Sequence, residues 1–123
     1  MLLRCLIVDD NASFLKAAAA LLERQGLTVA GVASTGAEAL TRAQELRPDV
    51  VLLDVVLGDE SGLDIARRLG AADPDGPTVI LISTHAEADF ADLIEATPAA
   101  GFVAKAELSA SAIRRFAAGP DAA

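Results

Sequence analysis

The chain of 123 residues is long enough for one domain with a single compact core, and 53% of its residues are hydrophobic. Its formal net charge of −8 argues against direct binding to DNA or RNA, because such affinity comes largely from Lys and Arg side chains that neutralise phosphates. The apolar stretches are too short to span a membrane, so we expect no signal peptide, no membrane contact and a cytoplasmic location.

Five short apolar runs of four to six residues alternate along the chain with longer stretches that have helical spacing. The runs cover residues 3–8, 29–33, 50–53, 78–82 and 101–104. Four of them are almost purely aliphatic, which is typical of parallel strands buried on both faces of a sheet. The alternation therefore predicts an α/β fold, in which a doubly wound, five-stranded parallel sheet carries helices on both faces.

The predicted helices cover residues 13–25, 35–47, 61–70, 87–96 and 108–117. The first is expected to end at Gly26, which suits a left-handed C-terminal cap. The second opens with the capping-box spacing of Thr35 and Glu38 and ends before Pro48. The single cysteine, Cys5, lies within the first apolar run and is expected to be a buried structural thiol.

Polar side chains follow four of the five predicted strands, at the points where those strands end. They are Asp9 and Asp10, Asp54, Ser83 and Lys105. Since the carboxyl ends of parallel strands meet at one edge of a sheet, where doubly wound folds bind ligands, we expect these side chains to converge. Clustered carboxylates repel one another unless a cation joins them, and Mg²⁺ suits such oxygen ligands. The sequence therefore predicts a magnesium site, where Lys105 would offset the acids or hold a phosphoryl oxygen.

Several of these residues also allow a simpler interpretation. Asp9 and Asp10 alone could be a helix-capping turn, since acids are favoured before a helix, and Lys105 could be a solvated surface charge. Asp54 is harder to explain by capping, because the six residues that follow it are expected to continue as loop. His85, the only histidine, is more consistent with a bystander or a modulator than with a catalytic residue.

The order, spacing and strand placement of these residues resemble the receiver domain of two-component response regulators, and the likeness covers essentially the whole chain. The matching features are Asp9 and Asp10 after the run that ends at Val8, Asp54 with Gly62 eight residues on, Ser83 and Thr84 after residues 79–82, and Gly101–Ala104 before Lys105. The resemblance implies the flavodoxin-like (βα)5 fold. It also implies a phosphorylation-dependent signalling switch, which accepts a phosphoryl group from a sensor histidine kinase, a phosphotransfer protein or a small donor such as acetyl phosphate.

By this resemblance Asp54 is the phosphoacceptor. Mg²⁺ would neutralise the phosphoryl oxygens during in-line transfer. Its ligands would be Asp9, Asp10, Asp54 and the backbone carbonyl of Val56. The domain would catalyse only its own phosphorylation and dephosphorylation, and would not be an enzyme that acts on other substrates.

The same resemblance gives roles to three further residues. Lys105 would pair with a phosphoryl oxygen, Ser83 would move to hydrogen-bond another, and Phe102 would swing from an exposed to a buried position. Phe102 alone is more typical of a core residue, and tyrosine is also common at this position in the family. A downstream protein would read the change on the fourth helix, fifth strand and fifth helix, and a homodimer would form through the same face.

The sequence departs from the common family pattern at several positions. Gly58 replaces a frequent proline four residues after the phosphoacceptor, which is expected to make this loop more mobile. Ala106 replaces a proline after Lys105, so we expect a trans peptide bond there. Thr84 and His85 replace smaller residues beside the switch hydroxyl, and we hypothesise that they alter the lifetime of the phosphoryl group.

Three other interpretations stay open at this point. A receiver domain without phosphorylation would serve as an interaction scaffold. A Mg²⁺-dependent phosphohydrolase would also use acids at strand ends, although the short loops leave little room for a substrate pocket. The chain could also be a piece of a regulator whose DNA-binding domain lies elsewhere. The leading interpretation is a stand-alone receiver domain over residues 1–118, with a short tail at 119–123.

Overall fold

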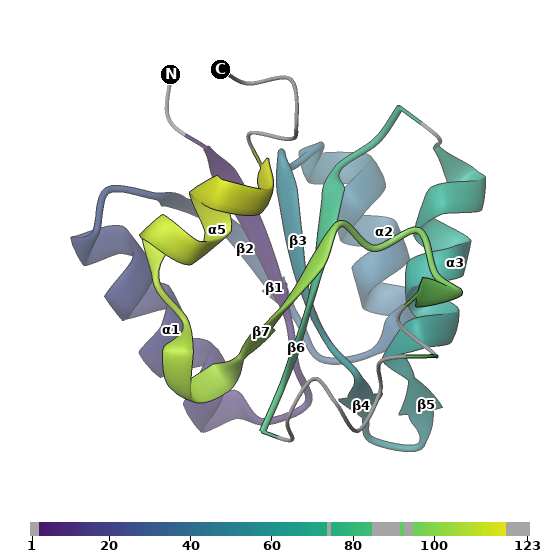
Figure 1. Cartoon of the computed structure of the whole chain (residues 1–123), viewed down its shortest axis with the longest axis horizontal. Helices are drawn as coiled ribbons and strands as arrows, with labels where there is room; N and C mark the ends of the chain where they lie inside the picture. The colour runs from purple at the N-terminus through teal and green to yellow at the C-terminus, as the bar shows by residue number, and fades with distance from the viewer. Residues whose placement is uncertain (1–2, 74, 85–91, 93–94, 118–123) are drawn as a thin grey trace.

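The computed structural model describes residues 3–73, 75–84, 92 and 95–117. Five parallel strands form one sheet in the order β2-β1-β3-β6-β7 (Figure 1). The strands are β1 (Arg4–Val8), β2 (Thr28–Ala33), β3 (Val50–Asp54), β6 (Thr78–Ser83) and β7 (Gly101–Ala104). The predicted doubly wound parallel sheet is confirmed. The strand order reverses between β1 and β3, and ligands of such sheets bind at this switch point.

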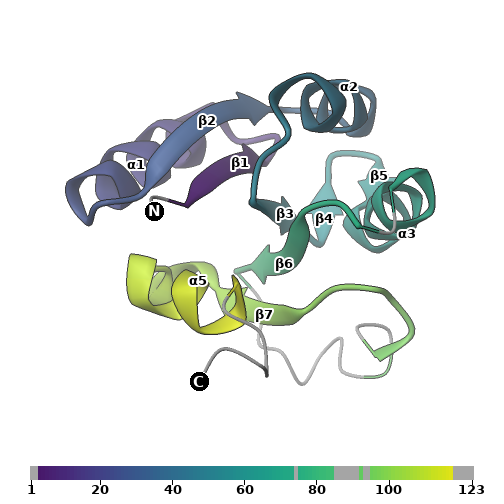
Figure 2. The same cartoon turned by 90° about the horizontal axis from the view of Figure 1, so that it is seen from above.

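Helices lie on both faces of the sheet, as predicted (Figure 2). On one face lie α1 (Ala12–Arg24) and α5 (Ala110–Ala117), and on the other lie α2 (Gly36–Leu46) and α3 (Gly62–Ala72). The helix predicted over residues 87–96 falls mostly outside the described residues. Among the helices that are described, none is long and apolar enough to cross a membrane.

The inner strands supply side chains to both faces, which explains why they show no polar alternation. In β3, Val50 and Leu52 pack in the cluster of α1 and α5, whereas Val51 and Leu53 pack in the cluster of α2 and α3. All five residues of this strand are buried. Asp54 is therefore a buried carboxylate at the end of an otherwise aliphatic strand.

Side-chain caps set the starts of the first two helices. The Phe14 N–H donates to Asn11 Oδ1 at 3.1 Å, so α1 begins one residue earlier than predicted. At its other end Gly26 has a φ of +93°, the left-handed conformation predicted for this cap. The Glu38 N–H donates to Thr35 Oγ1 at 3.1 Å, which confirms Thr35 as the cap of α2.

The start of α5 differs from the prediction. After β7, the residues Lys105–Glu107 form a 3₁₀ turn, and the helix begins at Ala110 rather than at residue 108. The Ala112 N–H donates to Ser109 Oγ at 3.0 Å, so this serine caps the helix. The bond from Lys105 to the next residue is trans, as predicted, like every other peptide bond in the described part of the chain.

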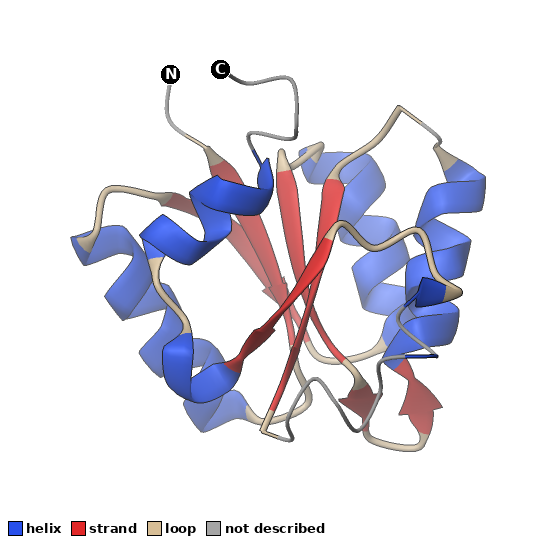
Figure 3. Cartoon of the chain, in the orientation of Figure 1, coloured by secondary structure: helices blue, strands red, loops and turns tan. Residues whose placement is uncertain are grey.

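The segment after β3 is predicted to be loop, but it contains a small antiparallel hairpin (Figure 3). Its strands are β4 (Val56–Leu57) and β5 (Glu60–Ser61), with Gly58 and Asp59 in the turn. Gly58 has a φ of +60°, which glycine adopts readily and proline cannot. Gly58 therefore fits this turn in place of the proline that is frequent in the family. The greater loop mobility expected from Gly58 stays a prediction.

Candidate functional site

Asp9 and Asp54 lie side by side at the carboxyl edge of the sheet. The strands β1 and β3 are neighbours, and their register pairs Val8 with Leu53. Asp9 directly follows Val8 and Asp54 directly follows Leu53, so the two acids are adjacent. Asp9 is 0% exposed and Asp54 is 7% exposed, whereas Asp10 is exposed. Two buried carboxylates cost free energy unless positive charge and hydrogen bonds compensate them.

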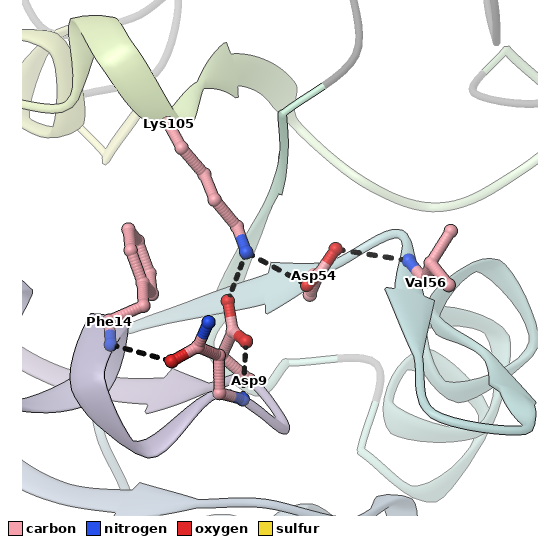
Figure 4. A network of polar contacts seen from close by, with 6 residues as sticks. Asp9, Phe14, Asp54, Val56 and Lys105 are labelled. Atoms are coloured by element: carbon pink, nitrogen blue, oxygen red, sulfur yellow. Dashed lines mark hydrogen bonds and ion pairs between the residues drawn. The ribbon is translucent and has the colours of Figure 1, made fainter.

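Lys105 supplies this positive charge. Its Nζ lies 2.5 Å from Asp9 Oδ2 and 3.0 Å from Asp54 Oδ2 (Figure 4). The lysine side chain is only 13% exposed. It extends from the turn after the edge strand β7 to the acids of two inner strands, as the convergence of strand ends predicts.

Backbone N–H groups orient both carboxylates. The Asn11 N–H donates to Asp9 Oδ1 at 2.9 Å, and the Val56 N–H donates to Asp54 Oδ1 at 3.0 Å. In each acid, one oxygen is fixed by the backbone two residues further along, and the other faces Lys105. The two carboxylates therefore have defined orientations.

Burial and charge shift the pKa values of the central pair. Burial raises the pKa of Asp54, and the hydrogen bonds from Lys105 and Val56 offset only part of this rise. The pKa of Lys105 is also raised: burial acts to lower it, but the carboxylates of Asp9 and Asp54 outweigh burial. Lys105 therefore stays positively charged at neutral pH.

The three predicted metal-binding acids come together at this edge. Asp9, Asp10 and Asp54 each place a carboxylate oxygen within 4.8 Å of the others. Asp9 Oδ2 is buried and forms the ion pair with Lys105, and it accepts no further hydrogen bond within the described residues. Three hard oxygen ligands, one of them buried with acceptor capacity left, fit a divalent cation such as Mg²⁺.

Gly62 allows α3 to approach the backbone of Asp54 closely. The N–H of Gly62, the first residue of α3, donates to the Val55 carbonyl at 2.7 Å, and a Cβ atom on this glycine would overlap the carbonyl oxygen of Asp54. A Cβ atom on Gly58 would make only an ordinary contact with Asp10 Oδ2, at 3.8 Å, so space does not require glycine at this position. The glycine eight residues after Asp54 is thus explained by close packing against the site.

The structure also places three of the other predicted site residues. Ser83, the last residue of β6, is buried at the same edge of the sheet, and Thr84 after it is exposed. Phe102 in β7 is partly buried and packs against the cluster of α2 and α3. His85 lies outside the described residues. The predicted movements of Ser83 and Phe102 stay predictions.

Phe14 contacts the site although the sequence predicts no functional role for it. The centre of its ring lies 4.4 Å from Lys105 Nζ (Figure 4). The ring also packs against the core cluster under α1, which is the role that its apolar spacing indicates. One signal could have found it: Phe14 lies in the first turn of the helix that follows Asp9 and Asp10, and therefore at the same edge.

Comparison with known proteins gives a family and close structural neighbours. The family model of the response regulator receiver domain matches residues 5–115. A two-component response regulator of the LuxR family from Aurantimonas sp. SI85-9A1 aligns over 99% of this chain and 93% of its own, with a TM-score of 0.87 and 27% identity. The signal receiver domain of NarL from Mycobacterium tuberculosis aligns over 96% and 98%, with a TM-score of 0.84 and 28% identity.

The chain is similar in sequence to proteins of different lengths. The DNA-binding response regulator MtrA of Mycobacterium tuberculosis is 41% identical over 91 residues, which are 74% of this chain and 38% of MtrA. A transcriptional regulator of Pseudomonas aeruginosa is 36% identical over 104 residues, 85% of this chain and 50% of its own, so the chain spans half or less of both. The chemotaxis protein CheY of Thermotoga maritima is 30% identical over 76% of this chain and 78% of its own. With the family model matched over most of its length, the chain belongs to the response regulator receiver domains of two-component systems.

Proposed function

We propose that this domain is a phosphorylation-dependent signalling switch with Asp54 as its phosphoacceptor. One observation carries the proposal: the Asp54 carboxylate is buried between the Lys105 ammonium and the Val56 N–H, with the carboxylates of Asp9 and Asp10 beside it. Receiver domains interact with histidine kinases or phosphotransfer proteins. Such a partner would supply the phosphoryl group to this chain.

Transfer to Asp54 needs no oxidant or reductant. A carboxylate oxygen of Asp54 attacks the phosphorus of a phosphohistidine, and the P–N bond breaks as the new P–O bond forms. The imidazole keeps the electron pair of the broken bond and takes up one proton. Acetyl phosphate would react in the same way and release acetate. The Val56 N–H keeps the Asp54 carboxylate oriented for this attack.

The acids of the site would hold Mg²⁺. The ligands would be Asp9, Asp10, Asp54 and the backbone carbonyl of Val56. When bound, the ion supplies positive charge that neutralises the phosphoryl oxygens in the transition state. The support for this assignment is the convergence of three carboxylates and the buried Asp9 oxygen that, apart from its ion pair with Lys105, accepts no hydrogen bond among the described residues.

Lys105 and the switch residues would respond to the new phosphoryl group. Lys105 would pair with a phosphoryl oxygen, since its Nζ already lies 3.0 Å from Asp54 Oδ2. Ser83 would move to hydrogen-bond another phosphoryl oxygen, and Phe102 would move into the space that Ser83 leaves. A downstream protein, or a second copy of the chain, would read the changed surface formed by β7, α5 and the helix predicted over residues 87–96.

Hydrolysis would end the signal. Water would attack the phosphorus of the acyl phosphate, which restores the Asp54 carboxylate and releases inorganic phosphate. The protein would thus act on its own phosphoryl group and not on an external substrate. We propose that Thr84 and His85 alter the rate of this step. Equal dephosphorylation rates for the wild type and His85→Ala would contradict the role of His85.

The setting of this domain is likewise a proposal. The curated relatives named as DNA-binding or transcriptional regulators are at least about twice as long as the part that the chain matches. We propose that this domain itself does not hold DNA, because its net charge is −8, and that DNA contact in such relatives belongs to their other parts. The stand-alone organisation and the cytoplasmic location stay predictions.

The proposal is tested by incubation with acetyl phosphate and Mg²⁺, followed by intact mass measurement. The wild type and the control Asp59→Asn should each gain one phosphoryl group, and Asp54→Asn should gain none. Asp59 is a suitable control because it is exposed in the hairpin turn five residues away. Uptake by Asp54→Asn would contradict the acceptor assignment. No uptake by the wild type would favour the scaffold, and turnover of an added phosphate ester would favour the phosphohydrolase.

A further inference from the structure

We propose that Phe14 is a positioning residue that holds the Lys105 ammonium in place for phosphoryl transfer, an inference that rests on the function proposed for Asp54. The Lys105 Nζ lies 4.4 Å from the centre of the Phe14 ring. The face of an aromatic ring carries partial negative charge and attracts a cation within about 6 Å. Figure 4 shows Lys105 between this ring and the carboxylates of Asp9 and Asp54.

Lys105 needs such a support because its side chain is long and flexible. A lysine ammonium is a point charge on a stem with several rotatable bonds, and it has no fixed geometry of its own. This stem extends from the turn after the edge strand β7 to acids on β1 and β3. The lysine side chain is only 13% exposed, so water competes weakly for the ammonium and the contact with the Phe14 ring is strengthened.

A single residue, Asn11, connects the backbone of Phe14 to the carboxylate of Asp9. The Asn11 N–H donates to Asp9 Oδ1 at 2.9 Å, and Asn11 Oδ1 accepts the Phe14 N–H at 3.1 Å. The backbone of Phe14 and the carboxylate of Asp9 are therefore both fixed by the first turn of α1. The Phe14 side chain also packs against the core, which restricts its orientation. Lys105 thus lies between two partners whose relative position is set before phosphorylation.

The expected effect of losing the ring face is a slower transfer to Asp54. An ammonium that moves freely is less often in place when the P–O bond to Asp54 forms. The range of cation–π contributions corresponds to a rate decrease of about twofold to thirtyfold. The residue acts through Lys105 and does not touch the phosphoryl group itself.

The first test does not depend on phosphorylation. The chain contains two lysines, Lys16 and Lys105, so [¹³C]lysine labelling gives two ε-methylene signals in NMR spectra, and Lys16→Arg assigns them. Lys16 is exposed and serves as the internal reference. The Lys105 signal should be shifted upfield by the ring and should move towards the Lys16 signal in Phe14→Leu. An unchanged Lys105 signal in Phe14→Leu would overturn the proposal.

The second test compares rates of phosphoryl uptake from acetyl phosphate with Mg²⁺. The variants are Phe14→Leu, Phe14→Tyr, and a protein with trifluorinated phenylalanine at position 14, which retains the size and apolar character but loses the electron density of the ring face. Phe14→Tyr should match the wild type, whereas the leucine and fluorinated proteins should be about twofold to thirtyfold slower. A fluorinated protein as fast as the wild type would show that the ring acts only through packing.

The two tests separate failure of this inference from failure of the function on which it rests. If the wild type takes up no phosphoryl group, the role proposed for Asp54 is wrong, while the NMR comparison still decides whether Phe14 holds Lys105. If Phe14→Leu does not fold, the fluorinated protein decides, because it preserves the packing of the ring against the core.

Discussion

Gly62 lies so close to Asp54 that any side chain on the glycine would overlap the backbone carbonyl oxygen of the aspartate. Gly62 is the first residue of α3, and its N–H donates to the carbonyl of Val55 at 2.7 Å. The helix therefore begins directly against the backbone that carries the proposed phosphoacceptor. A shift of α3 would move Asp54 with it.

We expect Gly62→Ala to lower the free energy of unfolding by about 2–3 kcal/mol, because overpacking of a closed site costs about 1–3 kcal/mol and backbone lies on the other side of this contact. Urea unfolding measures the change. Ser61→Ala is the matched control, since Ser61 is exposed and its side chain makes no capping hydrogen bond, so it should change stability by less than about 0.5 kcal/mol. Equal stability of the two variants would contradict the close contact.

We expect Gly58→Pro to destabilise the protein by about 2–3 kcal/mol, although proline is frequent at this position in the family. Proline fixes φ near −65°, whereas Gly58 has a φ of +60° in the hairpin turn. Gly58→Asn is the control, because asparagine tolerates positive φ, and should cost about 1 kcal/mol or less. The measurement is again urea unfolding. If Gly58→Pro is as stable as the wild type, the hairpin is able to use a different turn.

We expect Lys105→Met to lower the stability of the metal-free protein by about 3 kcal/mol. The variant leaves the buried carboxylates of Asp9 and Asp54 next to each other without their cation, and removal of one partner from a buried ion pair typically costs about 3–5 kcal/mol. Added Mg²⁺ should restore more stability in the variant than it adds to the wild type, since it replaces the missing charge.

The control for this comparison is Lys16→Met, which removes an exposed lysine and should change neither the stability nor its response to Mg²⁺ appreciably. Unfolding curves with and without Mg²⁺ give both quantities. A Lys105→Met protein that is as stable as Lys16→Met would show that the ion pairs of Lys105 contribute no net stability.

The thiol of Cys5 predicts a loss of stability at alkaline pH. Burial, and to a lesser extent the charge of Asp49, raises the pKa of Cys5 from 9.0 to about 11. The folded state therefore holds this proton more tightly than the unfolded state. The protonated Cys5 thiol therefore contributes about 2–3 kcal/mol to the free energy of unfolding. This contribution is complete below pH 9 and is lost as the pH rises through 11.

Urea unfolding of the wild type and Cys5→Ala between about pH 8 and pH 11.5 tests this dependence. The alanine variant should be less stable at neutral pH, because it leaves a small cavity, but its stability should fall less steeply with rising pH. All other ionisable groups are common to both proteins, so the comparison isolates the thiol. Parallel curves would mean that the thiol ionises equally easily in the folded and the unfolded state.

The fold and the centre of the site were predictable because both depend on local signals. A strand such as β3 is aliphatic on both sides only when helices cover both faces, so its composition indicates a parallel sheet. Asp9, Asp54 and Lys105 each follow directly after such a strand, and strand ends share one edge. Their convergence therefore follows from topology alone.

The rest depends on contacts between distant parts of the chain. The hairpin after β3 is too short to show a period, and its turn depends on the positive φ of Gly58. The start of α5 depends on how the chain turns after β7, where residues 105–107 form a 3₁₀ turn. The amino-acid composition of this segment does not predict where the helix then begins. The contact of Phe14 with Lys105 joins residues near opposite ends of the sequence; the position of Phe14 in the first turn of α1 places it at the edge of the site, but does not show that its ring reaches Lys105.

Asp9 and Asp54 lie next to each other at the sheet edge only because β1 and β3 have a fixed register. Side chains of a strand alternate between the two faces, so one additional residue within β1 would turn each later side chain towards the opposite helix layer. An aliphatic side chain would then meet the ammonium, although the composition of the strand had scarcely changed. Exchanges of one aliphatic residue for another should therefore be tolerated in these strands far better than insertions or deletions. The chemistry at the sheet edge depends on the number of residues in each strand as well as on the acids that end them.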